Sequence, residues 1–310
     1  MPEIIVTEFM DAAALDALRA DHDVHYDPAL VDKAEALEDL VQGARALIVR
    51  NRTQVRGPLL GKASKLVVVG RLGVGLDNID VVACKQRDIE VYPATGANDV
   101  AVAEYVVCGV MMLLRGAYHA SAEVAAGAWP RTRLMGREVS GKRLGLVGFG
   151  AIARETAQRA RALGMEVVAF DPFVSSEDPA WRAFGVAPQS LDDLLSGCDA
   201  VSLHVPLTPQ TRDLIDEGAL ARMKGGAVLI NAARGGVIEE AALASALKSG
   251  RLAGAMLDVF EAEPLPAGTC LSDVPNLILT PHIAGVTEES NVRVSALIAA
   301  KVSQFLKDRP

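Results

Sequence analysis

Short apolar runs alternate with amphipathic segments along the first third of the chain. Apolar residues recur at helical spacing through Leu15 and Leu18, and again through Leu37 and Leu40. Strands that alternate with helices are typical of a parallel sheet covered on both faces. The strands predicted here are Ile4–Val6, Ala46–Val49, Leu66–Val69 and Glu90–Tyr92.

The second half repeats this alternation more strongly. The predicted strands are Arg143–Val147, Glu166–Phe170, Ala200–Leu203, Ala227–Asn231, Gly254–Leu257 and Leu277–Leu279. Helical patterns fill the gaps, for example at Ile152–Leu163 and Glu239–Ser249, and a last helix covers Glu288–Leu306. About six such strands make a complete doubly wound sheet. The pattern therefore predicts an α/β protein with two doubly wound parallel-sheet domains of the Rossmann or flavodoxin-like kind.

A long apolar segment, Val100–Leu114, separates the two series of strands. It contains Glu104 and is shorter than a membrane span, so we interpret it as a buried core or interface helix. We expect one boundary at 97/98 and another at 285/286, so that the last helix returns to the first domain. The expected domains are 1–97 with 286–310, and 98–285.

Composition narrows the function classes. The 310 residues carry a net charge of −8, and an acidic chain of this kind does not fit a nucleic-acid binder. Its four cysteines are far apart and form no CxxC pair, so we expect neither a metal site nor a disulfide framework. The beginning of the chain has no signal-peptide pattern. These features predict a cytoplasmic protein without a role at a membrane.

Two glycine clusters follow predicted strands. The first runs from Gly70 to Asn78, and the large Asn78 takes the third position of a GxGxxG fingerprint, so a flexible loop fits it better. The second cluster, Gly148–Ala153, follows an apolar strand and opens a helix. Gly148 permits a tight turn, Gly150 lets the backbone approach a pyrophosphate, and Ala153 is small enough for close packing. The second cluster is therefore the predicted dinucleotide turn.

An acidic residue follows at the distance that this fingerprint requires. The next predicted strand ends at Asp171, about twenty residues after the turn. A carboxylate at this place accepts hydrogen bonds from ribose hydroxyls and repels the extra phosphate of NADP. The sequence therefore favours NAD. The alternative is that Asp171 and Pro172 only form a turn at the end of the strand.

Candidate reacting groups follow several strands of the second series. His282 follows the last strand, Arg234 an earlier one, and Glu263 the strand between them. The carboxyl ends of parallel strands share one edge of a sheet, where ligands bind. Hydride transfer to a ketone needs a proton donor, often histidine, and a cation for a substrate carboxylate. On pattern alone, Arg234 is equally well explained as a turn cap, and His282 as a packed loop residue.

At this point the motifs match a family. The chain resembles the D-isomer-specific 2-hydroxyacid dehydrogenases, in particular their phosphoglycerate dehydrogenase-like branch. The resemblance covers essentially the whole chain, and several ordered motifs are more specific than any single one. These motifs are Gly73–Asp80, the turn at Gly148, His204–Thr208, Asn231–Gly236, Asp258–Pro264 and Pro281–Gly285.

The resemblance implies a role for each matching position. His282 would be the general acid in reduction and the base in oxidation, and Glu263 would stabilise its protonated form. Arg234 would bind the substrate carboxylate and carbonyl oxygen, and Asp258 would hold the nicotinamide carboxamide. The implied NAD-binding residues are Gly148, Gly150, Ala151, Ile152, Asp171, His204, Pro206, Thr211, Ala232, Arg234, Asp258, His282 and Gly285. The helix after Asn98 is similar to the family's dimer-forming element, which implies a homodimer.

The rejected glycine cluster acquires a function through this resemblance. Backbone amides of Leu72, Gly73, Val74 and Gly75 would bind the substrate carboxylate, together with Arg234 and His282. Arg50, Arg52 and Arg71 follow strands of the first series and would bind a second anionic group, a phosphate or a sulfonate. The alternative is that these arginines are ordinary surface residues.

The nature of the second anion stays open at this point. Segments Thr7–Asp11 and Val49–Val55 look similar to those of the (S)-sulfolactate dehydrogenases, whose substrate carries a sulfonate and has the spatial arrangement of a D-hydroxyacid. The alternatives are 3-phosphoglycerate, or glyoxylate and hydroxypyruvate. An alternative from a different functional class is an NAD(H)-sensing corepressor, which would bind the cofactor with little turnover.

Overall fold

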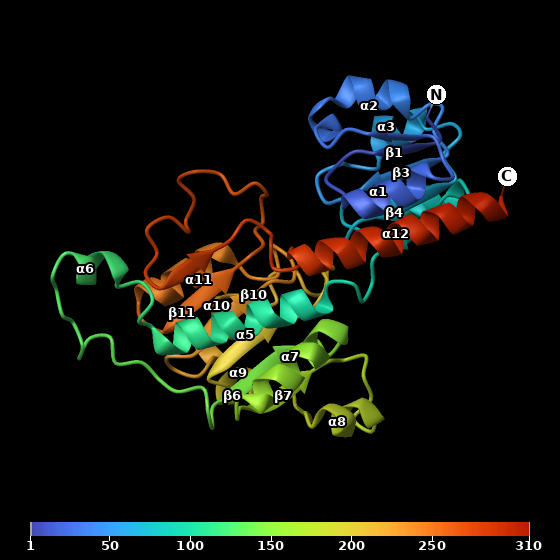
Figure 1. The fold of residues 1–310 in the computed structure, drawn as a ribbon. Helices are drawn as coiled ribbons and strands as arrows, with labels where there is room; N and C mark the ends of the chain where they lie inside the picture. The colour runs from blue at the N-terminus through green and yellow to red at the C-terminus, as the bar shows by residue number, and fades with distance from the viewer. Residues whose placement is uncertain (1, 310) are drawn as a thin grey trace. The chain divides into compact units, whose positions relative to one another are not determined.

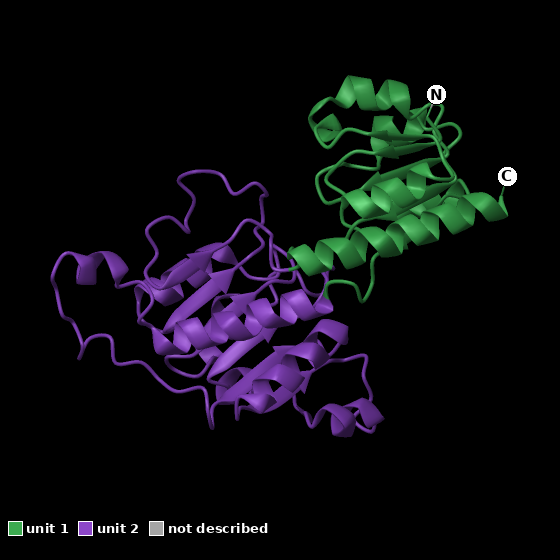
Figure 2. Cartoon of the chain, viewed as in Figure 1, with its two compact units in different colours: residues 1–98, 285–310 green, residues 99–284 purple. Residues whose placement is uncertain are grey.

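The computed structural model describes residues 2–309, which divide into two compact units (Figure 2). Unit 1 consists of Met1–Asn98 and Gly285–Pro310, and unit 2 of Asp99–Ala284. These limits lie one residue from the boundaries expected on the sequence. Both units are parallel sheets with helices on their faces, as the alternating pattern predicts (Figure 1).

Unit 1 is built on a five-stranded parallel sheet with the order β2-β1-β3-β4-β5. Its strands are β1 (Ile4–Val6), β2 (Val24–Tyr26), β3 (Ala46–Val49), β4 (Val68–Arg71) and β5 (Glu90–Pro93). Strand β2 was missed on the sequence because it is a short, half-exposed edge strand with His25 at its centre. The prediction of Leu66–Val69 was two residues too early. The strand extends through Gly70, where α12 packs too closely for a side chain. A Cβ there would lie 2.5 Å from a methyl carbon of Ile298.

Two layers of helices cover this sheet. One face packs against α1 (Ala12–Arg19) and α12 (Glu288–Asp308), and the other against α2 (Ala34–Leu40), α3 (Gly57–Lys62) and α4 (Val81–Gln86). A short 3₁₀ turn, η1, covers Leu30–Asp32. Asp11 caps α1, and Thr287 caps α12 in a capping box with Ser290.

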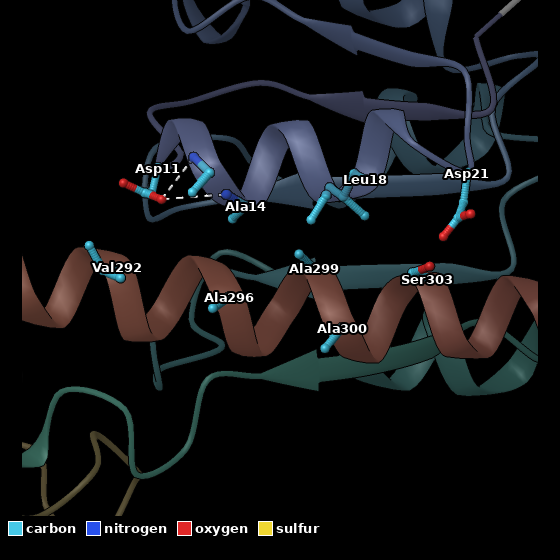
Figure 3. A pocket seen from close by; sticks show the side chains of 11 residues that line it. Asp11, Ala14, Leu18, Asp21, Val292, Ala296, Ala299, Ala300 and Ser303 are labelled. Atoms are coloured by element: carbon cyan, nitrogen blue, oxygen red, sulfur yellow. Dashed lines mark hydrogen bonds between the residues drawn. The ribbon is translucent and has the colours of Figure 1, made fainter.

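Small side chains line the groove where α1 and α12 run side by side (Figure 3). Ala14, Ala296 and Ala299 are among them, and the groove encloses about 370 Å³. The alanines allow the two helices to approach closely, which brings the end of the chain back onto the first strands. Unit 1 is therefore discontinuous in sequence.

Unit 2 is built on a seven-stranded parallel sheet with the order β12-β11-β10-β9-β6-β7-β8. Its strands are β6 (Arg143–Val147), β7 (Glu166–Phe170), β8 (Ala187–Pro188), β9 (Ala200–Leu203), β10 (Val228–Asn231), β11 (Gly254–Leu257) and β12 (Leu277–Leu279). The sequence predicted six of them. The seventh, β8, has only two exposed residues at the edge and gives no apolar pattern.

The helices of unit 2 also form two layers. On one face lie α5 (Asp99–Arg115), α7 (Ala151–Ala162) and α8 (Pro179–Phe184); on the other lie α9 (Leu191–Gly197), α10 (Glu217–Arg222) and α11 (Glu240–Lys248). A short helix, α6 (Ser121–Ala125), follows α5. The apolar helix α5 buries Val106, Val110 and Leu114. None of the helices in residues 2–309 combines the length and hydrophobicity that a bilayer crossing needs.

Candidate functional site

The glycine turn between β6 and α7 is shaped for a close approach. Gly148 has a φ of +96°, and a Cβ at this position would lie 2.6 Å from the carbonyl oxygen of His204. A Cβ on Gly150 would meet nothing within 4 Å, so the space in front of α7 is open. Ala153 is fully buried under the helix. An open helix N-terminus with unpaired amides is a site that suits a pyrophosphate.

Asp171 holds the turn from the end of the neighbouring strand. Its carboxylate accepts hydrogen bonds from the backbone N–H groups of Phe149, at 2.8 Å, and Phe173, at 2.9 Å. Each carboxylate oxygen can accept a further bond, so ribose hydroxyls can still be bound. Asp171 thus has a structural role in the turn that the sequence motif did not reveal.

His204 follows β9 directly behind the turn. The residue is partly buried, and its Nε2 atom, which is buried, has no hydrogen-bond partner within residues 2–309. Burial lowers the pKa of His204 to about 4, so the ring is neutral at physiological pH. In the same loop, the Thr211 hydroxyl donates to the carbonyl oxygen of Pro206 at 2.6 Å. A buried ring atom without a partner beside an open turn fits a site that a polar ligand completes.

Arg234 lies in a tight loop after β10. The Asn231 side chain spans this loop, donating to the Arg234 carbonyl oxygen at 2.8 Å and accepting from Ala233 N–H at 3.0 Å. A Cβ on Gly235 would lie 1.8 Å from the carbonyl oxygen of Phe260. The loops after β10 and β11 therefore touch, which only glycine allows here.

The loops after β11 and β12 bring His282 and Glu263 together. His282 Nδ1 lies 2.7 Å from Glu263 Oε2, and both side chains are about one-third exposed. The other oxygen of Glu263 accepts from Phe260 N–H at 3.1 Å. Burial alone would raise the pKa of Glu263, but the hydrogen bond and charge of His282, followed by the Phe260 N–H group and Arg234, outweigh it and lower this pKa. Glu263 is thus an ionised partner for an imidazolium, and Nε2 is the ring atom left for a substrate.

Asp258 is buried at the end of β11. Its carboxylate accepts hydrogen bonds from the backbone N–H groups of Ile283, at 2.8 Å, and Ala284, at 2.7 Å. The residue predicted to hold the nicotinamide carboxamide therefore also fixes the loop that carries His282.

In unit 1, Arg50 is held in place by two neighbours. Its Nη2 atom donates to Asn291 Oδ1 at 2.7 Å, and its guanidinium lies 5.7 Å from the centre of the Phe9 ring. Burial lowers the pKa of Arg50 and the nearby Glu8 opposes this, but a guanidinium in a protein keeps its charge. Arg52 instead forms an ion pair with Asp32, and both side chains are more than half exposed. The structure thus gives these two arginines different partners.

Arg71 and the first-domain glycine loop lie together. Arg71 Nη1 donates to the carbonyl oxygen of Leu72 at 2.9 Å, and a Cβ on Gly73 would lie 1.8 Å from the same nitrogen. Gly73 has a φ of +155°. The guanidinium therefore lies against the start of this loop, at Leu72 and Gly73.

Sequence reasoning missed two residues that organise the arginine segment. Glu8 is buried, and its carboxylate accepts from the backbone N–H groups of Arg50, Arg52 and Thr53 at 2.9, 3.3 and 3.1 Å. A carboxylate two residues after the end of an apolar strand was a signal that pointed to it. Asn291, by contrast, reaches Arg50 from α12 across 241 residues of sequence, and no local pattern marks it.

Comparison with known proteins decides the family. Residues 107–284 match the family model described as the NAD-binding domain of D-isomer-specific 2-hydroxyacid dehydrogenases. The chain belongs to this family. It is an NAD-dependent dehydrogenase of 2-hydroxyacids with two Rossmann-type units, which confirms the fold class, family, reaction class and cofactor predicted on the sequence.

Similar proteins include enzymes with different substrates. The chain is 56% identical to the (S)-sulfolactate dehydrogenase of Chromohalobacter salexigens over 99% of both chains. It is 41% identical to the D-3-phosphoglycerate dehydrogenase of Bacillus subtilis over 88% of this chain, but spans only 51% of that protein. The structure of a glyoxylate reductase from Paecilomyes thermophila superposes with a TM-score of 0.84 at 29% identity, covering 96% of this chain and 93% of that one. An NAD-dependent formate dehydrogenase from Staphylococcus aureus, in complex with NAD, gives a TM-score of 0.85 at 28% identity over 99% and 96%.

Proposed function

We propose that this dehydrogenase interconverts (S)-sulfolactate and its 2-keto acid with NAD. The contact of 2.7 Å between His282 and Glu263 carries the assignment of the reacting groups, because it provides a base with an ionised partner. The 56% identity over 99% of both chains supports sulfolactate as the substrate. Arg50, fixed by Asn291 and Phe9, supports a substrate with a second anionic group.

In the proposed mechanism, His282 Nε2 takes the hydroxyl proton of the substrate during oxidation. Glu263 stabilises the imidazolium that forms, and Arg234 binds the substrate carboxylate and polarises the carbonyl oxygen. When bound, NAD would supply the acceptor for the hydride that leaves the carbon bearing the hydroxyl group. The C–H and O–H bonds break as the C=O bond forms. In reduction the proton returns from His282 to the oxygen.

We assign the cofactor site to the edge of the unit 2 sheet. The turn residues Gly148, Gly150, Ala151 and Ile152 would hold the pyrophosphate, and Asp171 the adenosine ribose. The fit rests on the open space at Gly150 and on the unpartnered Nε2 of the neutral His204. The remaining residues proposed to contact the cofactor are Pro206, Thr211, Ala232, Arg234, Asp258, His282 and Gly285.

We assign substrate binding in unit 1 to two groups. The backbone amides of Val74 and Gly75 would bind the carboxylate, because the N–H groups of Leu72 and Gly73, also expected on the sequence, donate to the carbonyl oxygens of Val49 and Arg71 at 2.8 Å. Arg50, Arg52 and Arg71 would bind the second anion. Arg50 is the strongest of the three candidates. The hydrogen bond to Asn291 already orders its side chain, which reduces the entropy lost on binding, and its guanidinium is already partly desolvated. Arg52 would first have to leave Asp32.

A panel assay of NADH formation at 340 nm tests the proposal. The panel is (S)-sulfolactate, (R)-sulfolactate, 3-phosphoglycerate, D-lactate and D-glycerate with NAD, and glyoxylate and hydroxypyruvate with NADH. The highest kcat/KM is expected with (S)-sulfolactate, and no turnover is expected with its enantiomer. A higher kcat/KM with any other acid would contradict the proposed substrate.

A second candidate substrate is 3-phosphoglycerate. It is favoured by the relatives of that activity at 37–41% identity, and a phosphate would suit the same arginines. The panel separates it directly from sulfolactate. NADH binding without turnover of any acid would instead support the NAD(H)-sensing, corepressor-like alternative.

We further propose a cytoplasmic homodimer without nucleic-acid or membrane partners. Large apolar side chains are exposed on α5 and the segment after it, including Met111, Trp129 and Met135. Burial of such a surface would stabilise a dimer. Light scattering on the purified protein should give twice the mass of 32.6 kDa. The four free cysteines fit a reducing compartment, which cell fractionation tests.

A further inference from the structure

A chain of partly buried hydrogen bonds leads from α5 to the loop of His282. The Tyr105 hydroxyl lies 2.5 Å from Thr280 Oγ1, and Thr280 Oγ1 donates to Asp258 Oδ1 at 2.6 Å. The same carboxylate accepts from the N–H groups of Ile283 and Ala284. All five residues belong to unit 2.

The direction of each bond follows from the chemistry of the groups. An ionised carboxylate only accepts, so the single hydroxyl proton of Thr280 points to Asp258. The oxygen of Thr280 must then accept from the hydroxyl of Tyr105. Burial raises the pKa of Tyr105 to about 12, so the phenol keeps the proton that this bond requires.

The geometry of the loop explains what the chain of bonds does. Thr280 and Ile283 donate to the same oxygen of Asp258, so the segment is held on both sides of His282. Between these anchors, His282 has a φ of +56°, in the left-handed region that residues other than glycine rarely adopt. Such a conformation is energetically unfavourable and persists only where surrounding contacts enforce it.

We propose that Thr280 and Tyr105 are positioning residues for His282. They orient the Asp258 carboxylate, and this carboxylate fixes the backbone from which His282 reaches both Glu263 and the substrate. This proposal rests on the proposed role of His282 as acid and base. It gives α5 an indirect part in catalysis, through Tyr105, besides its packing in the core.

The variants Thr280→Val, Thr280→Ser and Tyr105→Phe test the chain of bonds. Valine removes the hydroxyl while keeping the shape, whereas serine keeps the hydroxyl. Thr156→Val is the control, because Thr156 is a threonine of unit 2 that is fully buried and whose hydroxyl donates to the Ile152 carbonyl oxygen within the same helix, at 2.8 Å.

Two measurements distinguish positioning from general loss of structure. Thr280→Val should lower kcat about 10- to 100-fold with KM changed less than about twofold, because misplacement of a reacting group slows the chemical step. The kinetic isotope effect on kcat with the C2-deuterated hydroxyacid should rise, because hydride transfer becomes more rate-limiting. Tyr105→Phe should act in the same direction more weakly, and Thr280→Ser and Thr156→Val should stay close to wild type.

Amide hydrogen exchange of the free protein gives a result that does not depend on turnover. The Ile283 and Ala284 amides should exchange faster in Thr280→Val than in wild type, and unchanged exchange would overturn the proposal. A reduced kcat with an unchanged isotope effect would also overturn it, because a smaller folded fraction gives that pattern. If the wild type turns over none of the acids while these amides respond as expected, the proposed function fails but the positioning chain stands.

Discussion

His282 Nδ1 lies 2.7 Å from Glu263 Oε2, although the two residues come from different loops of the unit 2 sheet. Glu263 is oriented in turn by the Phe260 N–H group, and its lowered pKa keeps it ionised. A carboxylate held in this way fixes the ring orientation of the histidine and stabilises its charged form. The catalytic proposal depends on this pair.

Glu263→Gln should weaken catalysis without loss of the fold. The amide cannot stabilise an imidazolium by charge, so kcat for keto-acid reduction should fall about 100-fold. Steady-state kcat for keto-acid reduction at pH 7.5 measures this effect, and urea unfolding of both proteins checks that the fold is kept. An unchanged kcat would mean that Glu263 does not act through His282.

His204 should make stability depend on pH in a defined range. Its folded-state pKa is about 4 and its ordinary value is 6.5, so the unfolded chain binds the proton more readily. Stability should therefore be unaffected by this residue above about pH 6.5 and should fall progressively as the pH drops toward 4. At about 1.4 kcal/mol for each pH unit, the full effect approaches about 3 kcal/mol.

Urea unfolding of the wild type and His204→Gln at pH 7.5 and pH 4.5 measures this effect. The variant lacks the titrating group, so its free energy of unfolding should fall less between the two pH values. An equal fall in both proteins would show that His204 is not buried in the neutral form.

The sequence predicted the parts of the molecule that depend on local patterns. The turn at Gly148 is recognisable because strand, glycines and helix are adjacent in the chain, and strong apolar runs located most strands. The apolar pattern did not predict β2, because His25 interrupts it on a half-exposed edge strand. It placed β4 two residues too early, because Gly70 is explained only by packing against Ile298.

The side-chain partners of the site were much less accessible to sequence reasoning. The pairing of His282 with Glu263 was implied by resemblance and not by spacing. No sequence pattern assigned different partners to Arg50 and Arg52. Arg50 bonds to Asn291, 241 residues away, and Arg52 to Asp32, 20 residues away. Such choices depend on three-dimensional packing, which a one-dimensional pattern does not encode.

Arg50→Met should discriminate between substrates. Removal of a charged hydrogen-bond donor to a sulfonate costs about 1.5–3 kcal/mol, which raises the KM for (S)-sulfolactate roughly 10- to 100-fold. D-lactate has no second anion, so any slow turnover of it should not change. Arg19→Met, which removes an exposed arginine of the same unit, is the control and should behave as wild type. Equal losses with both acids would exclude Arg50 as the selector of the second anion.

Glu8→Gln should disturb the backbone of residues 50–53, which carries Arg50 and Arg52. The Glu8 carboxylate accepts three backbone hydrogen bonds, whereas the glutamine amide has only one oxygen to accept them and turns its NH₂ group toward donors. The free energy of unfolding should fall by about 1–3 kcal/mol, and the KM for (S)-sulfolactate should rise. NADH affinity, followed by fluorescence titration, should not change. A shift in NADH affinity without a change in KM would place the role of Glu8 elsewhere.

The most direct test of the account is the rate of NADH formation from (S)-sulfolactate and NAD in wild type and His282→Gln. The wild type should produce NADH with saturation kinetics, and the variant should be slower by about 100-fold or more while it binds NADH with an affinity close to that of the wild type. Turnover by the variant at the wild-type rate would contradict the assignment of His282 as the acid and base.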